Sequence, residues 1–480
     1  MSIMKKSNFI QLWAVVFVLL LSFACKVPEA ALRQENKELP LAYNASGDSI
    51  NSAQIPWRSF FEDPNLKALI DSALSRNQEL NIFLQEIQIA NNEIKARKGE
   101  YLPFVSIQGG AGVDKVGRYT RFGALEATTE IKDGKEFPEP FTDLMVGAFA
   151  SWELDVWKKL RNSKKSAVFE YLATVEGRNF LITNLVSEIA SSYYELMALD
   201  NQLEIIRQTI EIQKNAYETV KLQKEAAKAT ELAVKRFEAE LAKNRSLIYA
   251  IQQEITETEN RINFLTGRFP QPIRRSSASF SESSPKLVQA GIPSQLLINR
   301  PDIRQAELEL AAAKLDVKVA RANFYPSFRI TAGMGFQAFN TRYLLTSPES
   351  MLYGLAGDLM APLVNRNAIK AQYQTANSKQ LQAVYEYEQR ILNGYYEVSN
   401  QIAKISNLEQ SANLKASQVQ ALTESIAISS SLFRSARADY MEVLLTQRDA
   451  LESKMELIET KAQQMNAMVH LYQALGGGWN

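Results

Sequence analysis

The chain is poor in the residues that usually carry chemistry. It has one histidine and one cysteine among 480 residues. A single cysteine cannot form a disulfide within one molecule, and the lone histidine, His470, has no cluster of Cys, His or acidic residues around it in sequence that could hold a metal. There is also no glycine-rich phosphate loop and no nucleophile elbow. We therefore expect a protein that is not an enzyme and has no cofactor and no metal site.

Net charge is missing as well. Lys and Arg total 54 and Asp and Glu total 53, so no overall field attracts nucleic acid or an acidic membrane face. Apolar residues make up 46% of the chain, which is enough for a sizeable core. We expect no nucleic-acid partner, and we expect other partners to be selected by local shape.

Long apolar runs are scarce. The run from Leu12 to Phe23, after Lys5 and Lys6, is short for a membrane span and has the form of a secretory signal over residues 1–24. It stops at Cys25, in a context that resembles a lipoprotein cleavage site and predicts lipidation there. The alternative is ordinary cleavage with an incidental cysteine. No apolar run of 18 residues follows, so we expect any membrane crossing to use β-strands.

The chain is internally duplicated. Residues 77–112 align without a gap to residues 300–335, and Tyr193-Tyr194-Glu195 later matches Tyr395-Tyr396-Glu397. Each copy is expected to contain a helix, a strand, a loop, a strand, a long helix, a turn and a helix. In chain order we expect a lipid-anchored extended segment 25–65, a first copy 66–269 with its hairpin about 103–156, a linker 270–293, a second copy 294–475 with its hairpin about 326–363, and a tail 476–480.

The predicted strands alternate with period two. From Val105 to Val113 every second residue is apolar or small, and the residues between them are polar or small. The stretches from Phe328, from Val146 to Val156 and from Tyr353 to Leu363 repeat this pattern. Each stretch has roughly ten residues, the length that a tilted strand needs to cross a bilayer. Alternation alone is equally compatible with a soluble sandwich.

The predicted helices carry coiled-coil seams. Apolar residues from Leu196 to Ile210 follow a 3-4 spacing, and so do those from Leu451 to Tyr472. No proline occurs from Lys164 to Glu225, so a helix of roughly 60 residues, about 90 Å long, is expected there. Such helices must pack side by side into a rod or a tube.

Four strands cannot close a barrel within one chain, because the smallest transmembrane barrels have about eight. Two chains would supply eight strands around a packed interior, whereas three chains would supply twelve strands and leave room for water. The polar and glycine-rich faces of the predicted strands favour the wider barrel. The predicted fold is thus an α+β membrane protein with a duplicated unit, in which four transmembrane strands per chain complete a twelve-stranded trimeric barrel. A long periplasmic coiled-coil barrel of helices continues it.

Three segments resemble a known family, the TolC-like outer-membrane efflux proteins, and its lipid-anchored NodT or OprM-like branch. The first runs from Gly291-Ile292-Pro293-Ser294 to Arg300-Pro301-Asp302-Ile303 and is similar to the branch's GLPSxLLxRRPDIxxAE stretch. The second, Trp152-Glu153-Leu154-Asp155-Val156-Trp157-Lys158-Lys159, resembles WELDLWGK, with Lys158 in place of glycine. The third is Ala320-Arg321-Ala322-Asn323-Phe324-Tyr325-Pro326.

The resemblance implies a homotrimer in the Gram-negative outer membrane, in contact with outer-membrane lipid. It also implies a periplasmic adaptor and an inner-membrane pump of the resistance-nodulation-division type, for which the trimer is the passive exit duct for small molecules or drugs. The helical turns at 224–232 and 434–443 would then form the gate and the adaptor contact, with Ala227 and Ala436 where the family has glycine. The candidate gate residues are Lys228, Glu231, Arg434, Arg437, Asp439 and Tyr440.

Two other functions stay open at this point. A duct for type I protein secretion would share the fold, although that branch generally lacks the lipid cysteine and the Gly291 to Asp302 stretch. A structural periplasmic coiled-coil protein would explain the helical seams and leave the strands unexplained. Among single residues, the tyrosine pairs are expected to pack between helices, and Gly147 and Gly354 are expected to relieve crowding between strands.

Overall fold

The computed structural model describes residues 27–28, 33–43, 49–282, 287–364, 366–435 and 437–480. The expected signal segment and Cys25 lie outside these residues. The chain folds into two compact units. Unit 1 holds Gln88–Leu172 and Leu308–Val384 together with the residues up to Gln34, and unit 2 holds Glu35–Ile87, Ala173–Glu307 and Tyr385–Asn480.

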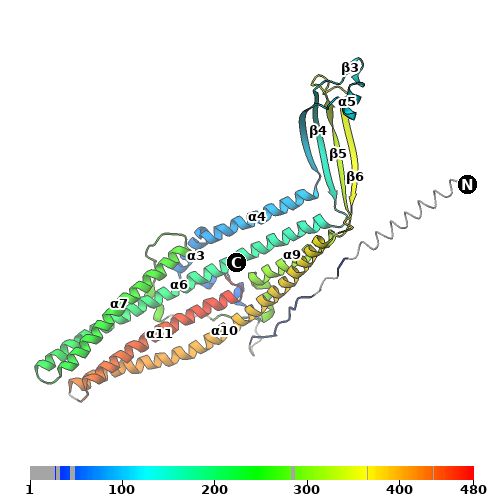
Figure 1. The fold of residues 1–480 in the computed structure, drawn as a ribbon. Coiled ribbons are helices and arrows are strands. Elements are labelled where there is room, and N and C mark those ends of the chain that lie inside the picture. Colours follow the sequence, from blue (N-terminus) through cyan, green and yellow to red (C-terminus); the bar gives the residue numbers. More distant parts are fainter. Residues whose placement is uncertain (1–26, 29–32, 44–48, 283–286, 365, 436) are drawn as a thin grey trace. The chain divides into compact units, whose positions relative to one another are not determined.

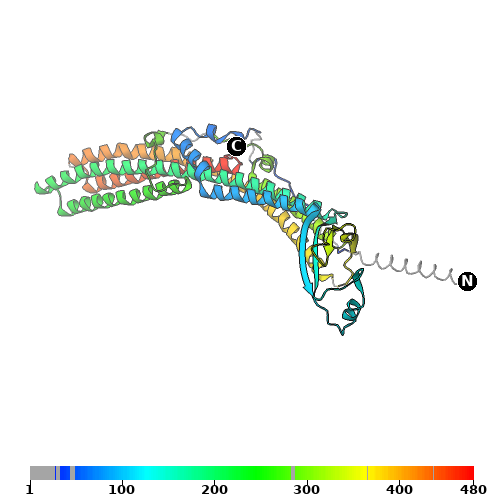
Figure 2. The ribbon, with the colours of Figure 1, turned by 90° about the horizontal axis from the view of Figure 1, so that it is seen from above.

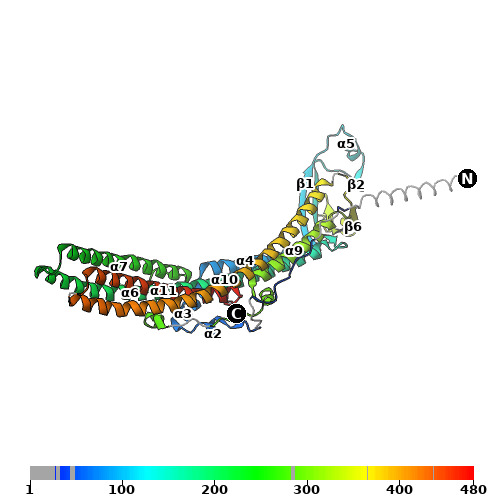
Figure 3. The same cartoon turned by 90° about the horizontal axis from the view of Figure 1, so that it is seen from below.

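Unit 1 contains a sheet of four antiparallel strands in the order β1-β4-β5-β6 (Figure 1). Its strands are β1 (Phe104–Asp114), β4 (Phe141–Leu154), β5 (Ser327–Ala338) and β6 (Met351–Met360). The connection from β1 to β4 holds α5 (Arg121–Glu126), β2 (Glu130–Lys132) and β3 (Lys135–Glu136), and α5 lies beyond the end of the long strands (Figure 3). The pairing of β4 with β5 joins the first copy to the second.

Two returning strands have bounds that differ from those expected. Strand β4 begins at Phe141 rather than Val146, because residues 141–145 continue the ladder with β1 although Phe141 and Met145 are apolar residues on the otherwise polar side of the strand. Strand β6 covers Met351–Met360 and ends three residues before the expected Leu363. Pro362 lies in that interval and has no N–H to donate to a ladder.

Helices flank the strands in the same way in both copies, which confirms the predicted duplication. The first copy has α4 (Gln78–Tyr101), α6 (Lys159–Glu225) and α7 (Glu231–Leu265), and the second has α9 (Pro301–Ala322), α10 (Asn367–Arg434) and α11 (Tyr440–Ala474). The long helices have 67 and 68 residues, and the returning helices have 35 each. None of the helices in the described part of the chain has an apolar stretch of the length that a bilayer crossing requires.

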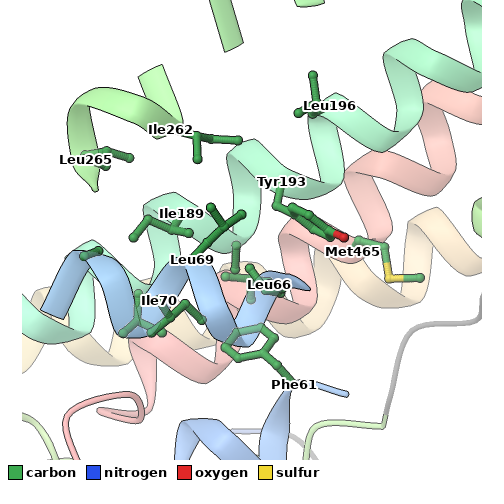
Figure 4. Packing of buried hydrophobic residues seen from close by; sticks show 14 of the residues in the cluster. Phe61, Leu66, Leu69, Ile70, Ile189, Tyr193, Leu196, Ile262, Leu265 and Met465 are labelled. Atoms are coloured by element: carbon green, nitrogen blue, oxygen red, sulfur yellow. The ribbon is translucent and has the colours of Figure 1, made fainter. Parts of the chain in front are cut away.

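The main core of unit 2 forms where short N-terminal helices pack on the long ones. These are η1 (Ser52–Gln54), α2 (Trp57–Phe60) and α3 (Pro64–Arg76), so part of the segment expected to be extended is helical. Pro64 is the first residue of α3, a position for which the fixed φ of proline is suited, and Pro56 directly precedes α2. Figure 4 shows Leu66, Leu69 and Ile70 of α3 facing Ile189 and Tyr193 of α6. Each such fully buried side chain contributes about 1.5 to 3 kcal/mol.

The linker between the copies also packs on unit 2. It contains η2 (Ser277–Glu282) and is followed by η3 (Pro293–Gln295) and α8 (Leu296–Asn299), and its Ile273 and Phe280 belong to the core cluster. Arg275 holds it by ion pairs to Asp200, at 2.6 Å, and to Glu259, at 2.5 Å. These pairs outweigh the effect of burial and raise the pKa of Arg275. The linker is therefore a packed part of the unit.

The two helical hairpins of unit 2 have their turns at the same end (Figure 2). Between the turns lies a small cluster of buried residues, among them Val220, Val234 and Phe237, with Phe433 and Tyr440 packed against it from the second hairpin. The two tyrosine pairs expected to pack between helices differ from each other in burial. Tyr193 of the first pair is fully buried, whereas Tyr396 of the second pair is 66% exposed.

Candidate functional site: a two-faced sheet and two helical turns

The sheet of unit 1 has one apolar face, and the strand register defines it. Ile107, Ala148, Met334 and Tyr353 lie in one cross-strand row of that face. Ile107 is 83% exposed and Tyr353 is 81% exposed in the single chain. The remaining large members are Val105, Val113, Leu144, Val146, Trp152, Leu154, Phe328, Ile330, Phe336, Leu355 and Leu359. A continuous exposed apolar face of this kind needs a covering medium or partner.

The opposite face, here called the polar face, carries small and polar residues. Its rows contain Ser106, Gln108, Ser151 and Thr331, and at the helical end Glu153, Arg329 and Asp358 stand side by side on β4, β5 and β6. At the other end Gln337 donates to both carboxylate oxygens of Asp143, at 2.9 Å each. The alternation predicted from the sequence therefore separates an apolar face from a polar one.

Two glycines on the polar face mark a close approach of neighbouring strands. A Cβ added to Gly335 would lie 2.4 Å from the Val146 carbonyl oxygen, and one added to Gly147 would lie 2.8 Å from that of Met334. The backbones of β4 and β5 therefore approach closely at Gly147 and Gly335 and leave no room for a side chain there. Gly147 relieves crowding as expected, but Gly354 does not, because a Cβ there would meet nothing within 4 Å.

The two outer strands of the sheet are open. Within the described residues, β1 pairs only with β4, and β6 pairs only with β5. Each outer strand therefore presents a row of unpaired backbone groups, which natural sheets cover or pair.

The family-like stretch around Trp152 and Asp155 joins β4 to α6. The Trp152 indole donates to the Tyr101 carbonyl at 3.1 Å. The Asp155 carboxylate accepts from the backbone N–H groups of Leu160 and Arg161 at 2.9 and 3.0 Å, and so satisfies free donors at the start of α6. This contact explains why α6 begins at Lys159, five residues before the expected Lys164. Burial alone would raise the pKa of Asp155, but hydrogen bonds from Arg161 and Leu160 lower it.

The second family-like stretch forms a buried joint around Arg300. Pro293 begins η3 and Pro301 begins α9. The Arg300 guanidinium binds both carboxylate oxygens of Asp302, at 3.0 and 2.7 Å, and also reaches Glu397 and the carbonyl oxygen of Ala474, the last residue of α11. Burial would lower the pKa of Arg300, but its bonds to Asp302 and the charge of Glu397 raise it.

The first copy builds the same joint with a neutral side chain. The Asn77 amide donates to the carbonyl oxygen of Leu265, the last residue of α7, at 2.9 Å. Gly267 and Gly476, both with positive φ, follow the two helix ends. A Cβ at either would lie 2.4 Å from a backbone oxygen, that of Arg76 or that of Asn299. Only glycine fits these two positions.

The first helical turn lies between α6 and α7. Helix α6 ends with a hydrogen bond from the Lys228 N–H to the Gln223 carbonyl at 2.7 Å, and Ala227 has a φ of 57°. This is the Schellman arrangement, in which glycine is usual at the position that Ala227 occupies. Glu231 pairs with Lys224 across the turn at 2.7 Å, and a hydrogen bond from Lys224 lowers the pKa of Glu231.

The second turn closes in the same way. The Arg437 N–H donates to the Leu432 carbonyl at 2.9 Å. Arg434 and Asp439 are exposed, and the Arg434 guanidinium donates to the Ser430 carbonyl at 3.3 Å within its own helix. Asp439 precedes α11, and Tyr440, the first residue of α11, packs against the cluster between the turns. The structure thus brings the two turns together, while Glu231 has Lys224 as its ion-pair partner within one chain.

His470 lies in a polar pocket of about 360 Å³ that also contains Arg300, Asp302 and Glu397. Its Nδ1 is 3.2 Å from the Gln473 amide oxygen and 3.5 Å from the Ser187 hydroxyl. In the described ranges, no group of three or more His, Cys, Asp and Glu side chains is placed to bind a metal ion.

These features define a class of protein: an outer-membrane channel subunit built from a duplicated helix and strand unit. Solved structures of that class have this fold. A CusC structure superimposes with a TM-score of 0.82 at 24% identity, covering 94% of this chain and 99% of that one. VceC of Vibrio cholerae superimposes with a TM-score of 0.78 at 21% identity, covering 90% and 100%.

The chain belongs to the outer membrane efflux protein family, whose model matches residues 69–268 and 292–477, one match in each copy. It is 26% identical to the probable outer membrane lipoprotein SilC of Salmonella typhimurium over 92% of both chains. It is 29% identical to the cation efflux system protein CusC of an Escherichia coli strain over 88% of both. The protein is an outer-membrane channel subunit of an efflux pump.

Proposed function

We propose that three copies of this chain close one twelve-stranded barrel through which a pump exports its cargo. The observation that carries the proposal is the sheet with an apolar face, a polar face and two open edges. In lipid every backbone group needs a partner, so the edge of β6 must pair with the edge of β1 in the next copy. Three sheets of four strands leave a water-filled lumen lined by the polar face.

Native mass spectrometry in detergent tests the trimer, with a mass of three chains as the expected result. Cysteine pairs placed one on β1 and one on β6 should form disulfides between chains at every second position. Matched pairs on β1 and the interior strand β5 should not. A folded monomer, or inter-chain disulfides with β5 in place of β6, would contradict the architecture.

The duct performs no chemistry and takes its cargo from an inner-membrane transporter of the resistance-nodulation-division type through a periplasmic adaptor. Relatives similar to this chain are named for unlike cargoes: CusC for cations, OpmQ for pyoverdine and TtgI for toluene. The simplest explanation for such different cargoes on one fold is that the inner-membrane pump, and not the outer-membrane duct, selects the cargo. The cargo of this chain is then whatever its own pump delivers.

The two helical turns form the periplasmic gate and the adaptor contact. Lys228, Arg434, Arg437 and Asp439 are exposed at turns that pack together, where three copies would converge. Lys224 and Glu231 hold the first turn closed on itself. A photo-crosslinking residue at Lys228 should capture a periplasmic adaptor identifiable by peptide mass, and the same residue at Thr128, beyond the strands, should not. Equal capture of the adaptor at Lys228 and at Thr128 would show that the helical turns are not the specific adaptor contact.

A further inference from the structure

An aromatic ring lies on the polar face of the sheet, among its small and polar residues. Phe149 of β4 stands opposite Gly333 of β5, with Ser106 and Gly354 completing the same cross-strand row. A Cβ built on Gly333 would lie 2.7 Å from Cδ1 and 2.9 Å from Cε1 of the Phe149 ring, and one built on Gly147 would lie 3.2 Å from its Cε2. The ring therefore lies flat against the backbone, in a depression that the two glycines leave.

The glycines around this ring differ in what a side chain would displace. At Gly335 the nearest atoms are the backbone oxygen of Val146 and the Cα of Gly147, at 2.4 and 2.6 Å. Backbone cannot yield there without breaking the strand pairing. At Gly333 every close atom belongs to the Phe149 side chain, and a side chain can move by rotating to another staggered conformation. An alanine at Gly333 would thus lift the ring and leave the ladder intact.

We propose that the Phe149 side chain sets the inner diameter of the barrel that is open to solutes. Gly333 is the positioning residue that keeps the Phe149 ring against the strands of the barrel wall. The proposal rests on the proposed trimeric channel, because only there does the polar face enclose a lumen. Three copies place three rings at one level. With the rings flat the bore is open, and with the rings lifted each projects toward the axis and narrows it.

Labelling from outside the cell tests the proposal without depending on the state of the helical turns. A cysteine is introduced as Ser151→Cys, which lies on the polar face two residues beyond Phe149 toward the helical end of the strand. Intact cells are treated with a small hydrophilic maleimide and with maleimides on polymers of increasing size. The chain without Ser151→Cys gives the background, since its one cysteine is Cys25. Native mass spectrometry checks that each variant assembles.

Adding Gly333→Ala should slow labelling by the largest reagents several-fold and leave the small reagent unaffected. Gly354→Ala is the matched control, because it makes the same exchange in the same row with nothing within 4 Å. Its labelling should equal that of the parent. Phe149→Ala combined with Gly333→Ala should restore the parent rates, because the lifted group is then absent.

Unchanged labelling in Gly333→Ala, or slow labelling that persists in the double variant, would overturn the role of Phe149. A Gly333→Ala chain that fails to assemble would do so too, because the ring would then be unable to yield. If the small maleimide does not reach Ser151→Cys in the parent background, the polar face does not line a water-filled lumen. That result would contradict the proposed function itself.

Discussion

Two residues with side chains adopt a backbone conformation that normally belongs to glycine. Lys158 has a φ of 61° before α6, and Ala227 has a φ of 57° at the end of α6. Both stand where the family pattern has glycine. A left-handed conformation costs a residue with a Cβ about 1 to 2 kcal/mol. Both junctions of the longest helix in the first copy are therefore strained, and neighbouring contacts must hold them.

Replacing Ala227 with glycine should relieve that strain. Ala227→Gly is expected to stabilise the folded chain by up to about 1 kcal/mol, because the gain at positive φ exceeds the flexibility that glycine adds to the unfolded chain. Ala226→Gly, one residue earlier and without a positive φ, should destabilise it by about 0.5 to 1 kcal/mol. Denaturation midpoints of the solubilised protein compare the two. A midpoint lowered equally by both changes would show that Ala227 is unstrained.

The buried joint around Arg300 and its counterpart around Asn77 should lose different amounts of folding stability when each is mutated. Arg300→Ala leaves Asp302, whose side chain is only 6% exposed, without its partner and should cost about 3 to 5 kcal/mol. Asn77→Ala removes the neutral counterpart in the first copy and should cost about 1 to 3 kcal/mol. The same denaturation experiment measures both variants. Equal losses would mean that the charges at Arg300 add nothing beyond the helix cap.

At the level of helices and strands, the sequence predicts the type of each element better than the residues at which it begins and ends. The two-residue alternation identifies all four long strands and their faces, and the proline-free stretch identifies α6. The start of β4 is missed because Phe141 and Met145 are apolar residues on the polar face, which hides the alternation, while the backbone there still pairs with β1. The pairing of Glu231 with Lys224 is missed because it joins residues on either side of a turn. The Phe149 depression depends on which residues face each other across strands, and no single stretch of sequence contains that register.

The start of α6 gives a prediction that depends on pH. The pKa of Asp155 is lower in the folded chain than in the unfolded one, so its capping contribution is complete above the unfolded pKa, near 4, and is lost as the pH falls through the folded value. Asp155→Asn keeps a neutral acceptor and lacks this titration. The difference in unfolding free energy between the parent and Asp155→Asn should therefore shrink as the pH falls below about 4. A difference that stays constant over that range would exclude the carboxylate charge as its cause.

The turns give a prediction about conductance. If Arg434, Arg437 and Asp439 latch the gate, replacing all three with alanine should raise conductance in planar bilayers above a mostly closed level. Single replacements should have little effect, because exposed ion pairs contribute about 0 to 1 kcal/mol each. The control removes the exposed pair Lys235 and Glu238 of α7 and should leave the closed level unchanged. If the triple variant assembles and conducts like the parent, these three residues only shape the turn and do not hold the gate closed.

On the scale of the whole molecule, the lipid anchor expected at Cys25 would be an attachment to the membrane that is independent of the sheet. Cys25→Ala should abolish labelling by a palmitate analogue, because the acyl chains would be attached at that sulfur and at the new N-terminus. Assembly should persist, because the apolar face of the sheet still holds the chain in the membrane. Undiminished labelling would show that the anchor lies elsewhere, and loss of the trimer would show that the two attachments are coupled.

The equal lengths of the two helical hairpins restrict how this chain can evolve. Because α6 and α10 differ by one residue and α7 and α11 have equal lengths, the two turns arrive together and share the cluster around Phe237. Seven residues inserted into both helices of one hairpin would carry its turn about 10 Å past the other. Tyr440 would then lose its place on the cluster. An insertion or deletion in one hairpin should therefore be tolerated only together with a matching change in the other hairpin. The lengths of the two hairpins should thus change together during evolution.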